Sequence, residues 1–126
     1  FHASDHDIRM QEAAAVIALI QKLHATAPVL LQGDLNHTPE APEYALWTDA
    51  GLVEVTGKHG MAQAPTAPSV NPRVHIDYIW ATPKLAKQST HAEVLNTPPF
   101  VLASDVKFSY ALSDHLPVLA NFNVRT

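Results

Sequence analysis

The strongest constraint on the fold is an apolar segment that ends in polar residues, "PVLLQG" at residues 28–33 followed by Asp34, Leu35 and Asn36. A run that is apolar on both sides is typical of a strand inside a sheet that is covered on both faces. Asp34 and Asn36 face the same side of an extended chain, since side chains alternate along a strand. The segment therefore predicts a buried interior strand that presents a carboxylate and an amide to one ligand. A plain Gly-Asp turn is the alternative.

A long helix is expected before this strand. Apolar residues recur there at helical spacing: Ala13, Val16, Ile17, Ile20 and Leu23. The spacing predicts a helix over residues 6–25, which Pro28 prevents from continuing. Residues that suit the N-cap stand at its start: Ser4, Asp5 and Asp7.

The rest of the chain predicts a mixture of helices, strands and one long loop. Residues 38–51 predict a short helix, with Thr38 as N-cap, Pro39 in its first turn and Gly51 after its end. Residues 57–73 are rich in Pro, Gly and small side chains and predict a long surface loop, a kind of segment that often carries function. Three further strands are expected, over residues 74–82, 90–95 and 116–124. Alternation places the side chains of the first of these on two faces: His75, Asp77 and Ile79 on one, and Ile76, Tyr78 and Trp80 on the other.

Composition narrows the function classes. The chain has 126 residues, of which 47% are hydrophobic, which suits one domain with a packed core. The formal net charge is -4 and the 8 Lys and Arg are scattered, so no basic stripe for long nucleic acids is present. The absence of Cys excludes disulfides, thiolate zinc sites and cysteine nucleophiles. No apolar stretch reaches the roughly 18 residues typical of a membrane span.

Two more predicted strand ends carry reactive side chains. Asp77 lies in an apolar strand, where an unpaired carboxylate is costly, so we expect a histidine partner; capping by backbone amides is the alternative. Ser113, Asp114 and His115 directly precede the last strand. An acid beside a histidine can supply one metal or phosphate contact and one proton carrier. A simple turn with a solvated histidine is the alternative there.

Together these segments resemble a known superfamily. The order G-D-x-N-x-x-P (residues 33–39), I-D-Y-I (76–79) and S-D-H-x-P (113–117) is similar to that of the endonuclease/exonuclease/phosphatase superfamily, in particular its deoxyribonuclease-like branch. The resemblance extends from Phe1 to about Val124. It implies an α+β fold, the C-terminal half of a four-layer α/β/β/α sandwich. Residues 1–126 would then form a single partial domain whose N-terminal half is absent.

The resemblance also implies a chemistry. It implies hydrolysis of a phosphate ester by activated water, with Mg²⁺ or Mn²⁺ as the cofactor that hard oxygen ligands favour. His115 would be the general base, oriented by Asp77. Asp34 and Asn36 would hold the attacking water, the phosphoryl oxygens or the metal. Asp114 would bind the metal.

The opening "FHAS" resembles the family strand that carries a second catalytic histidine just before a helix. His2 would then act as an acid or stabilise charge on the phosphate; a histidine at a frayed chain end is the alternative. Arg73 would contact a substrate phosphate or, as we favour, lie on the surface. His37 is close to the site without an assigned role. We expect the remaining histidines at the surface: His6, His24, His59 and His91.

Nothing in the sequence matches the first half of the family domain, which supplies a metal-binding Glu. We therefore expect weak metal binding and a partner that covers the exposed sheet: a second chain carrying the first half, or a homo-oligomer. Two function classes compete, a metal-dependent phosphoesterase and a catalytically incomplete fragment or binding remnant. The substrate would be a phosphate ester in a nucleic acid, a phospholipid or a small phosphodiester. The missing basic stripe mildly favours the latter two.

Overall fold

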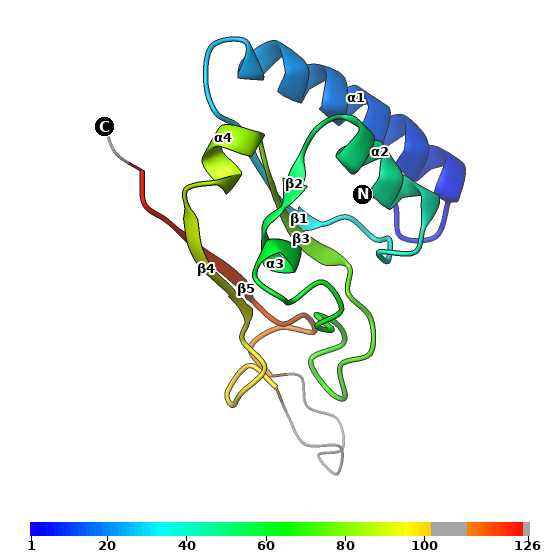
Figure 1. The fold of residues 1–126 in the computed structure, drawn as a ribbon. Helices are drawn as coiled ribbons and strands as arrows, with labels where there is room; N and C mark the ends of the chain where they lie inside the picture. The colour runs from blue at the N-terminus through cyan, green and yellow to red at the C-terminus, as the bar shows by residue number, and fades with distance from the viewer. Residues whose placement is uncertain (102–110, 125–126) are drawn as a thin grey trace.

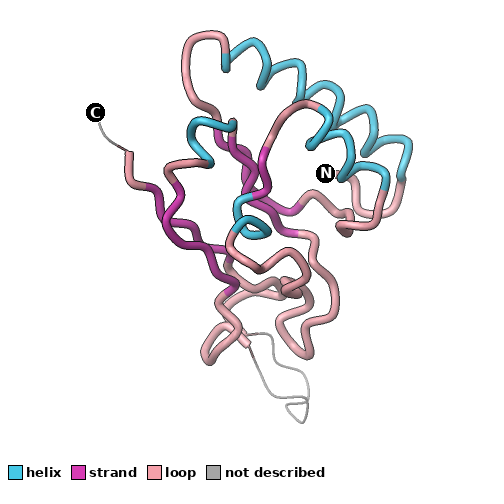
Figure 2. The backbone as a smooth tube through the Cα atoms, viewed as in Figure 1, coloured by secondary structure: helices cyan, strands magenta, loops and turns pink. Residues whose placement is uncertain are grey.

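The computed structural model describes residues 1–101 and 111–124 and shows an α+β fold (Figures 1 and 2). Its elements in chain order are α1 (His6–His24), β1 (Leu30–Asp34), α2 (Pro42–Asp49), β2 (Val53–Glu54), α3 (Val55–Lys58), β3 (Asp77–Ala81), α4 (Pro83–Ala86), β4 (Ser89–Val94) and β5 (Val118–Phe122). The strands form an antiparallel sheet in the order β1-β3-β2 and a separate antiparallel ribbon, β4-β5. Helices α1 and α2 lie on one side of the sheet, and the ribbon lies on the other (Figure 1).

The core is divided between the two faces of β3. Tyr78 and Trp80 pack with Trp47 of α2 and with Ala13 and Ile20 of α1. Ile79 and Ala81 pack instead with Val55, Ala86 and Ala92 and with the apolar side chains of β5. The alternation predicted for Tyr78, Trp80 and Ile79 is therefore confirmed. It is wrong for His75, whose ring packs edge-on against Tyr78 with 4.7 Å between centroids, because regular strand structure begins only at Asp77.

Local sequence signals define the two longer helices unequally well. Helix α1 begins at His6, and the Asp5 side chain caps it by accepting a hydrogen bond of 3.0 Å from the Ile8 amide. The predicted helix and its cap are thus confirmed. Helix α2 starts at Pro42 rather than near Thr38, because the Thr38 carbonyl accepts the Ala41 amide in a preceding turn.

The prediction of a buried interior strand is wrong for β1. Among residues 1–101 and 111–124, this strand lies at the edge of the sheet and pairs with β3 alone, so one row of its backbone groups has no partner strand there. Leu30 remains 39% exposed, and Gln32 and Gly33 are exposed as well. A strand that is apolar on both faces is expected to be covered on both. The described residues cover β1 mainly on the face toward α1, where Leu31 packs.

The predicted surface loop over residues 57–73 is partly buried. Thr66 and Ser69 have no exposed surface, and Ala67 forms an isolated bridge with Val74. Backbone hydrogen bonds join this segment to Asp114 and Leu116, which precede β5, and this contact accounts for its burial. Small side chains are thus used here for close packing rather than for solvent exposure.

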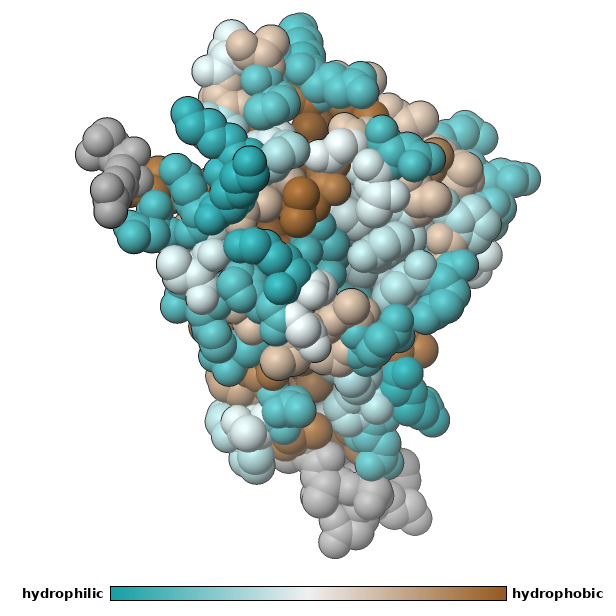
Figure 3. All heavy atoms as spheres, in the orientation of Figure 1, coloured by the Kyte–Doolittle hydropathy of each residue, from teal (hydrophilic) through white to brown (hydrophobic). Residues whose placement is uncertain are grey.

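The surface seen in Figure 3 is mostly hydrophilic, with apolar side chains in small separate patches. No helix in the described ranges is long and apolar enough to cross a membrane.

Candidate active site

The centre of the candidate site is a contact between His115 and Asp77. Asp77 begins β3, and His115 lies in the loop before β5. The Nδ1 atom of His115 is 2.9 Å from Oδ2 and 3.1 Å from Oδ1 of Asp77, which confirms the expected hydrogen bond. A carboxylate only accepts, so Nδ1 carries the proton and Nε2 points away from Asp77.

Charge around His115 favours its protonated form. Burial alone would lower the pKa of His115, but the hydrogen bond to Asp77 and the negative charges of Asp77, Asp34 and Asp114 raise it above the usual value. Asp77 contacts the imidazole directly, and the charges of Asp34 and Asp114 also raise its proton affinity. This environment is typical of a histidine that exchanges protons near neutral pH.

Thr66 is a site residue that the sequence did not identify. Its hydroxyl donates to Asp77 Oδ2 at 2.6 Å and accepts from the backbone amides of Ile76 and Asp77 at 3.1 and 3.2 Å. Both oxygens of the Asp77 carboxylate are therefore held in place, by a histidine on one side and a buried threonine on the other. Only the position of Thr66 in a long loop of small residues offered a signal for it.

The loop that carries His115 is held against the Thr66 segment by three further hydrogen bonds. The Leu116 amide donates to the Thr66 carbonyl at 2.7 Å, and the Ser69 amide donates to the Asp114 carbonyl at 2.7 Å. The Ser69 hydroxyl donates to the Ser113 carbonyl at 2.6 Å. These contacts fix the backbone on both sides of His115 and so fix the position of its ring.

The Asp34 and Asn36 motif forms a turn beside this pair. Asp34 is the cross-strand partner of Asp77, so the two side chains lie on the same face of the sheet. Asp34 Oδ1 accepts the Asn36 amide at 2.8 Å, and Asn36 has a φ of +52°, a left-handed conformation that Asn tolerates. Asn36 Nδ2 donates to the Phe1 carbonyl at 2.8 Å, which leaves Oδ1 to act as a ligand. The turn interpretation is therefore confirmed, and the geometry of the turn is compatible with a ligand role for Asn36 Oδ1, which stays a prediction.

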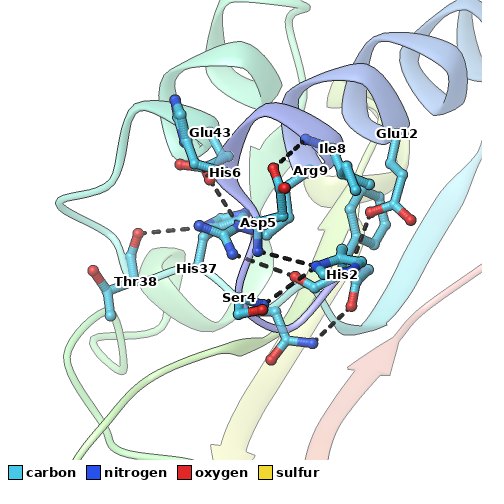
Figure 4. A network of polar contacts seen from close by, with 12 residues as sticks. His2, Ser4, Asp5, His6, Ile8, Arg9, Glu12, His37, Thr38 and Glu43 are labelled. Atoms are coloured by element: carbon cyan, nitrogen blue, oxygen red, sulfur yellow. Dashed lines mark hydrogen bonds and ion pairs between the residues drawn. The ribbon is translucent and has the colours of Figure 1, made fainter.

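His2 is connected to the same turn through Phe1 and makes hydrogen bonds of its own. Its Nδ1 atom accepts the amide of Asp5 at 3.0 Å, with a longer contact of 3.4 Å from Ser4 (Figure 4). Its own amide donates to Glu12 Oε2 at 2.8 Å. Because Nδ1 is an acceptor, the proton of the neutral ring lies on Nε2.

The remaining predicted site residues are more exposed. Asp114 is exposed and is held through its main chain, with its carboxylate near His115. Arg73 is exposed, and no hydrogen bond or ion pair joins its side chain to a described residue of the site. The structure thus places Arg73 on the surface.

The other histidines divide into core and surface groups. His37 is 97% buried: its Nε2 accepts from Trp47 Nε1 at 3.0 Å, its ring stacks on Tyr78, and burial lowers its pKa. It is a core residue rather than a site residue. His59 is half-buried, with Nε2 at 3.0 Å from Ser89 Oγ, so the expectation that it is exposed is wrong. His6, His24 and His91 are exposed as expected.

A pocket of about 290 Å³ opens beside the pair. It lies between three segments that are distant in sequence, and it is lined by Gln32 and Gly33 of β1, Asp77 and Ile79 of β3, and Leu116 and Pro117 before β5. Asp77 lines this space, so a small ligand in the pocket can reach the aspartate of the pair.

The described residues fit a divalent metal in type but not in number. Asp34, Asn36 and Asp114 offer hard oxygen atoms of the kind that Mg²⁺ prefers. However, no three His, Asp or Glu side chains within residues 1–101 and 111–124 come close enough together to hold a metal ion.

Residues 3–115 match the model of the Endonuclease/Exonuclease/phosphatase family. The chain belongs to this family. The resemblance seen in the order of the motifs and the α+β fold that it implied are both confirmed. Comparison with curated proteins gives no match.

Solved structures of this family share the fold. A mannosyl-6-phosphatase from Bacteroides thetaiotaomicron has a TM-score of 0.72 at 19% identity, over 97% of this chain and 48% of its own. A 3′ phosphatase from Neisseria, bound to a product DNA hairpin, has a TM-score of 0.69 at 18% identity, over 96% and 56%. An AP endonuclease from Archaeoglobus fulgidus has a TM-score of 0.66 at 22% identity, over 91% and 53%. The chain spans about half the length of these structures.

Proposed function

We propose that this chain provides the histidine–aspartate pair of a phosphoesterase, which hydrolyses a phosphate ester bond with water as nucleophile. The observation that carries the proposal is the contact of His115 Nδ1 with both oxygens of Asp77, at 2.9 and 3.1 Å. Membership of a family of nucleases and phosphatases supports this reaction class. The nearby carboxylates and the adjoining pocket support a site that binds and activates small polar groups.

In the proposed reaction, Nε2 of His115 takes a proton from water as the water oxygen bonds to phosphorus. The phosphorus–oxygen ester bond breaks on the opposite side. The leaving oxygen takes up a proton from solvent, and His115 then returns its own proton to solvent. Asp77 stabilises the imidazolium that forms, and Thr66 keeps the carboxylate in place. His2, with its proton on Nε2, donates a hydrogen bond to a phosphoryl oxygen as negative charge builds there.

Asp34 and Asn36 orient the water or the phosphoryl oxygens in this proposal, and Asp114 adds an oxygen donor. Asp34, Asn36 and Asp114 would hold Mg²⁺ or Mn²⁺ together with further donors that complete the ligand set. The open edge of β1 suits such a contribution, from a second chain with the first half of the family domain or from another copy of this chain.

The substrate class is inferred from charge and from the relatives. The named relatives are a sugar-phosphate phosphatase, a DNA 3′ phosphatase and an AP endonuclease, so phosphate esters of several kinds suit this fold. A net charge of -4 with scattered basic residues favours a small or lipid-linked phosphodiester over long DNA.

A catalytically incomplete binding unit is the second candidate. It is favoured by one observation, the lack of a three-residue metal cluster among the described residues. Such a unit would keep the shape of the site and bind phosphate esters without hydrolysing them.

Hydrolysis of bis-p-nitrophenyl phosphate with added Mg²⁺ or Mn²⁺ separates the two candidates. We expect slow hydrolysis by the full chain and its loss in His115→Asn and Asp77→Asn. His91→Asn is the matched control, because it removes an exposed histidine from β4 and should leave the rate unchanged. Equal rates for His115→Asn and the unaltered chain would contradict the phosphoesterase proposal, and no hydrolysis by any of them would favour the binding unit.

A further inference from the structure

A buried ion pair lies beside the His2 segment and outside the proposed reaction centre. Glu43 of α2 is 99% buried. Its Oε1 atom accepts from Arg9 Nε and from His6 Nδ1, each at 2.8 Å. Burial alone would raise the pKa of Glu43, but hydrogen bonds from its own backbone amide, His6 and Arg9 lower it to about 2. The carboxylate is therefore ionised at neutral pH.

Helix packing alone does not explain this pair. Joining two helices through buried charges is often no more favourable than joining them through apolar side chains, because both charges lose water. The second oxygen of Glu43, Oε2, is buried and has no partner within the described residues. The pair therefore carries a desolvation cost that an apolar contact between α1 and α2 would not carry.

The other end of Arg9 reaches the main chain that carries His2. Arg9 Nη1 donates to the carbonyl oxygens of His2 and Ala3, at 3.3 and 3.4 Å, while Nε stays on Glu43 (Figure 4). The planar guanidinium thus connects a fixed, buried charge to the backbone of an otherwise exposed segment. A lysine could make one of these contacts but not both, since its ammonium is a single point.

The orientation of the His2 ring depends on this backbone. Nδ1 of His2 accepts the amide of Asp5 at 3.0 Å, and that bond requires the turn from residues 2 to 5 to keep its shape. Arg9 holds the two carbonyls at the start of the turn. Asn36, on the other side, holds the preceding carbonyl of Phe1.

We propose that Arg9 and Glu43 are a positioning pair, which holds the main chain at His2 and Ala3 so that the His2 ring keeps Nδ1 on the Asp5 amide and presents Nε2–H to the phosphoryl group. This inference rests on the proposed function and extends it to two residues that do not touch the substrate. Arg9 acts on the ring only through the backbone, and Glu43 acts only through Arg9.

Amide hydrogen exchange of the full, ¹⁵N-labelled chain tests the positioning without substrate. We expect the Asp5 amide to exchange about tenfold faster in Arg9→Lys, because the turn opens once its carbonyls are released. His6→Asn is the matched control: it removes the other partner of Glu43 Oε1 but leaves Arg9 in place, so the Asp5 exchange rate should stay within about twofold of the original. Glu43→Gln is a second variant, which keeps the side-chain volume and should act like Arg9→Lys.

Steady-state kinetics separate a positioning role of Arg9 from a role in stability alone. In the hydrolysis assay, Arg9→Lys should lower kcat about tenfold with little change in KM, because His2 acts on the charge that builds in the transition state. A folded Arg9→Lys with an unchanged Asp5 exchange rate and unchanged kcat would overturn the positioning role, even in an active enzyme. Absence of hydrolysis by the unaltered chain would contradict the proposed function, while the exchange result would still decide whether Arg9 holds the turn.

Discussion

Asp34 and Asp77 stand directly opposite each other on adjacent antiparallel strands, with both side chains on the same face of the sheet. Two like charges in one cross-strand pair are destabilising, so this arrangement is unusual for a sheet that serves stability alone. The His115 ring is hydrogen-bonded to Asp77, and the carboxylates of Asp34 and Asp77 both raise the pKa of His115. The two carboxylates thus create a negative potential at this site, which a protonated histidine or a bound cation can neutralise.

Removal of one acid should therefore stabilise the metal-free chain. We expect Asp34→Asn to raise the free energy of unfolding by about 0.2–1 kcal/mol, since the cross-strand repulsion disappears. The Asn side chain keeps an oxygen that can accept the Asn36 amide. Urea unfolding at pH 8 measures the change, with Glu93→Gln, which removes a partly exposed acid from β4, as control. A loss of stability in Asp34→Asn alone would show that repulsion is not the dominant effect.

The Asp77 carboxylate should control the proton affinity of His115. We expect Asp77→Asn to lower the pKa of His115, as followed by the NMR shift of its ring protons, because the charge and the hydrogen bond that raise the pKa are removed. The variant should also lose most activity of the complete enzyme with little change in metal affinity. Equal activity would contradict the role given to Asp77.

The raised pKa of His115 predicts how the free energy of unfolding changes with pH. A histidine with a raised pKa in the folded state adds stability that is fully present below its unfolded pKa of about 6.5 and is lost as pH rises through the higher folded value. Asp77→Asn should remove this dependence above pH 6.5. A pH–stability curve of the same shape in both proteins would contradict it.

Thr66 should be needed for the shape of the site. Thr66→Val removes the donor to Asp77 and the acceptor for two backbone amides in a fully buried position. We expect a loss of about 1–3 kcal/mol in the free energy of unfolding, together with lower activity. Thr66→Ser keeps the hydroxyl and is the control, which should lose much less. Similar losses in both variants would indicate a packing role instead.

The sequence was most informative where the signal was local. Helix α1 and its Asp5 cap follow from spacing and capping chemistry within a few residues. The Asp77–His115 pair, although 38 residues apart, was found because a carboxylate in an apolar strand needs a partner and the order of the motifs supplied one. The family and its α+β fold followed from the same order.

The errors concern contacts that only the folded chain creates. β1 has the apolar pattern of an interior strand, but its position at the edge depends on which strands pair, and nothing within residues 28–33 encodes that. Thr66 lies in a segment whose composition is that of a surface loop, and its burial results from packing against the loop before β5. His75 fails the alternation because the strand starts two residues later.

Metal binding by this chain should be weak. Asp34, Asn36 and Asp114 supply suitable oxygens, yet the described residues form no three-residue His, Asp or Glu cluster. We expect calorimetry to show Mg²⁺ affinity no tighter than the millimolar range, and EDTA to leave the melting temperature unchanged. Tight binding by the isolated chain would mean that a ligand outside this set exists.

Glu54 should make the free energy of unfolding depend on pH between its ordinary pKa and its raised one. This residue of β2 is 93% buried, and its carboxylate accepts from the Thr56 amide at 2.9 Å and from the Thr56 hydroxyl and Gly57 amide. Burial raises its pKa to about 7 despite these hydrogen bonds. The folded state therefore binds more protons than the unfolded state between the ordinary Glu pKa of about 4.3 and a pH of about 7.

The stability that comes from this proton is complete below pH of about 4.3 and is lost as pH rises through about 7, with a slope of at most about 1.4 kcal/mol per pH unit. Glu54→Gln cannot ionise, but it keeps an oxygen that can accept the same amides, so its free energy of unfolding should fall less across this range. Denaturant unfolding from pH 4.5 to 8 measures the difference between the two curves. Glu93→Gln on β4 is the control, because that side chain is partly exposed and should leave the slope unchanged. If Glu54→Gln follows the unaltered chain at every pH, then the Glu54 carboxylate is already ionised in the folded state and its three hydrogen bonds outweigh its burial.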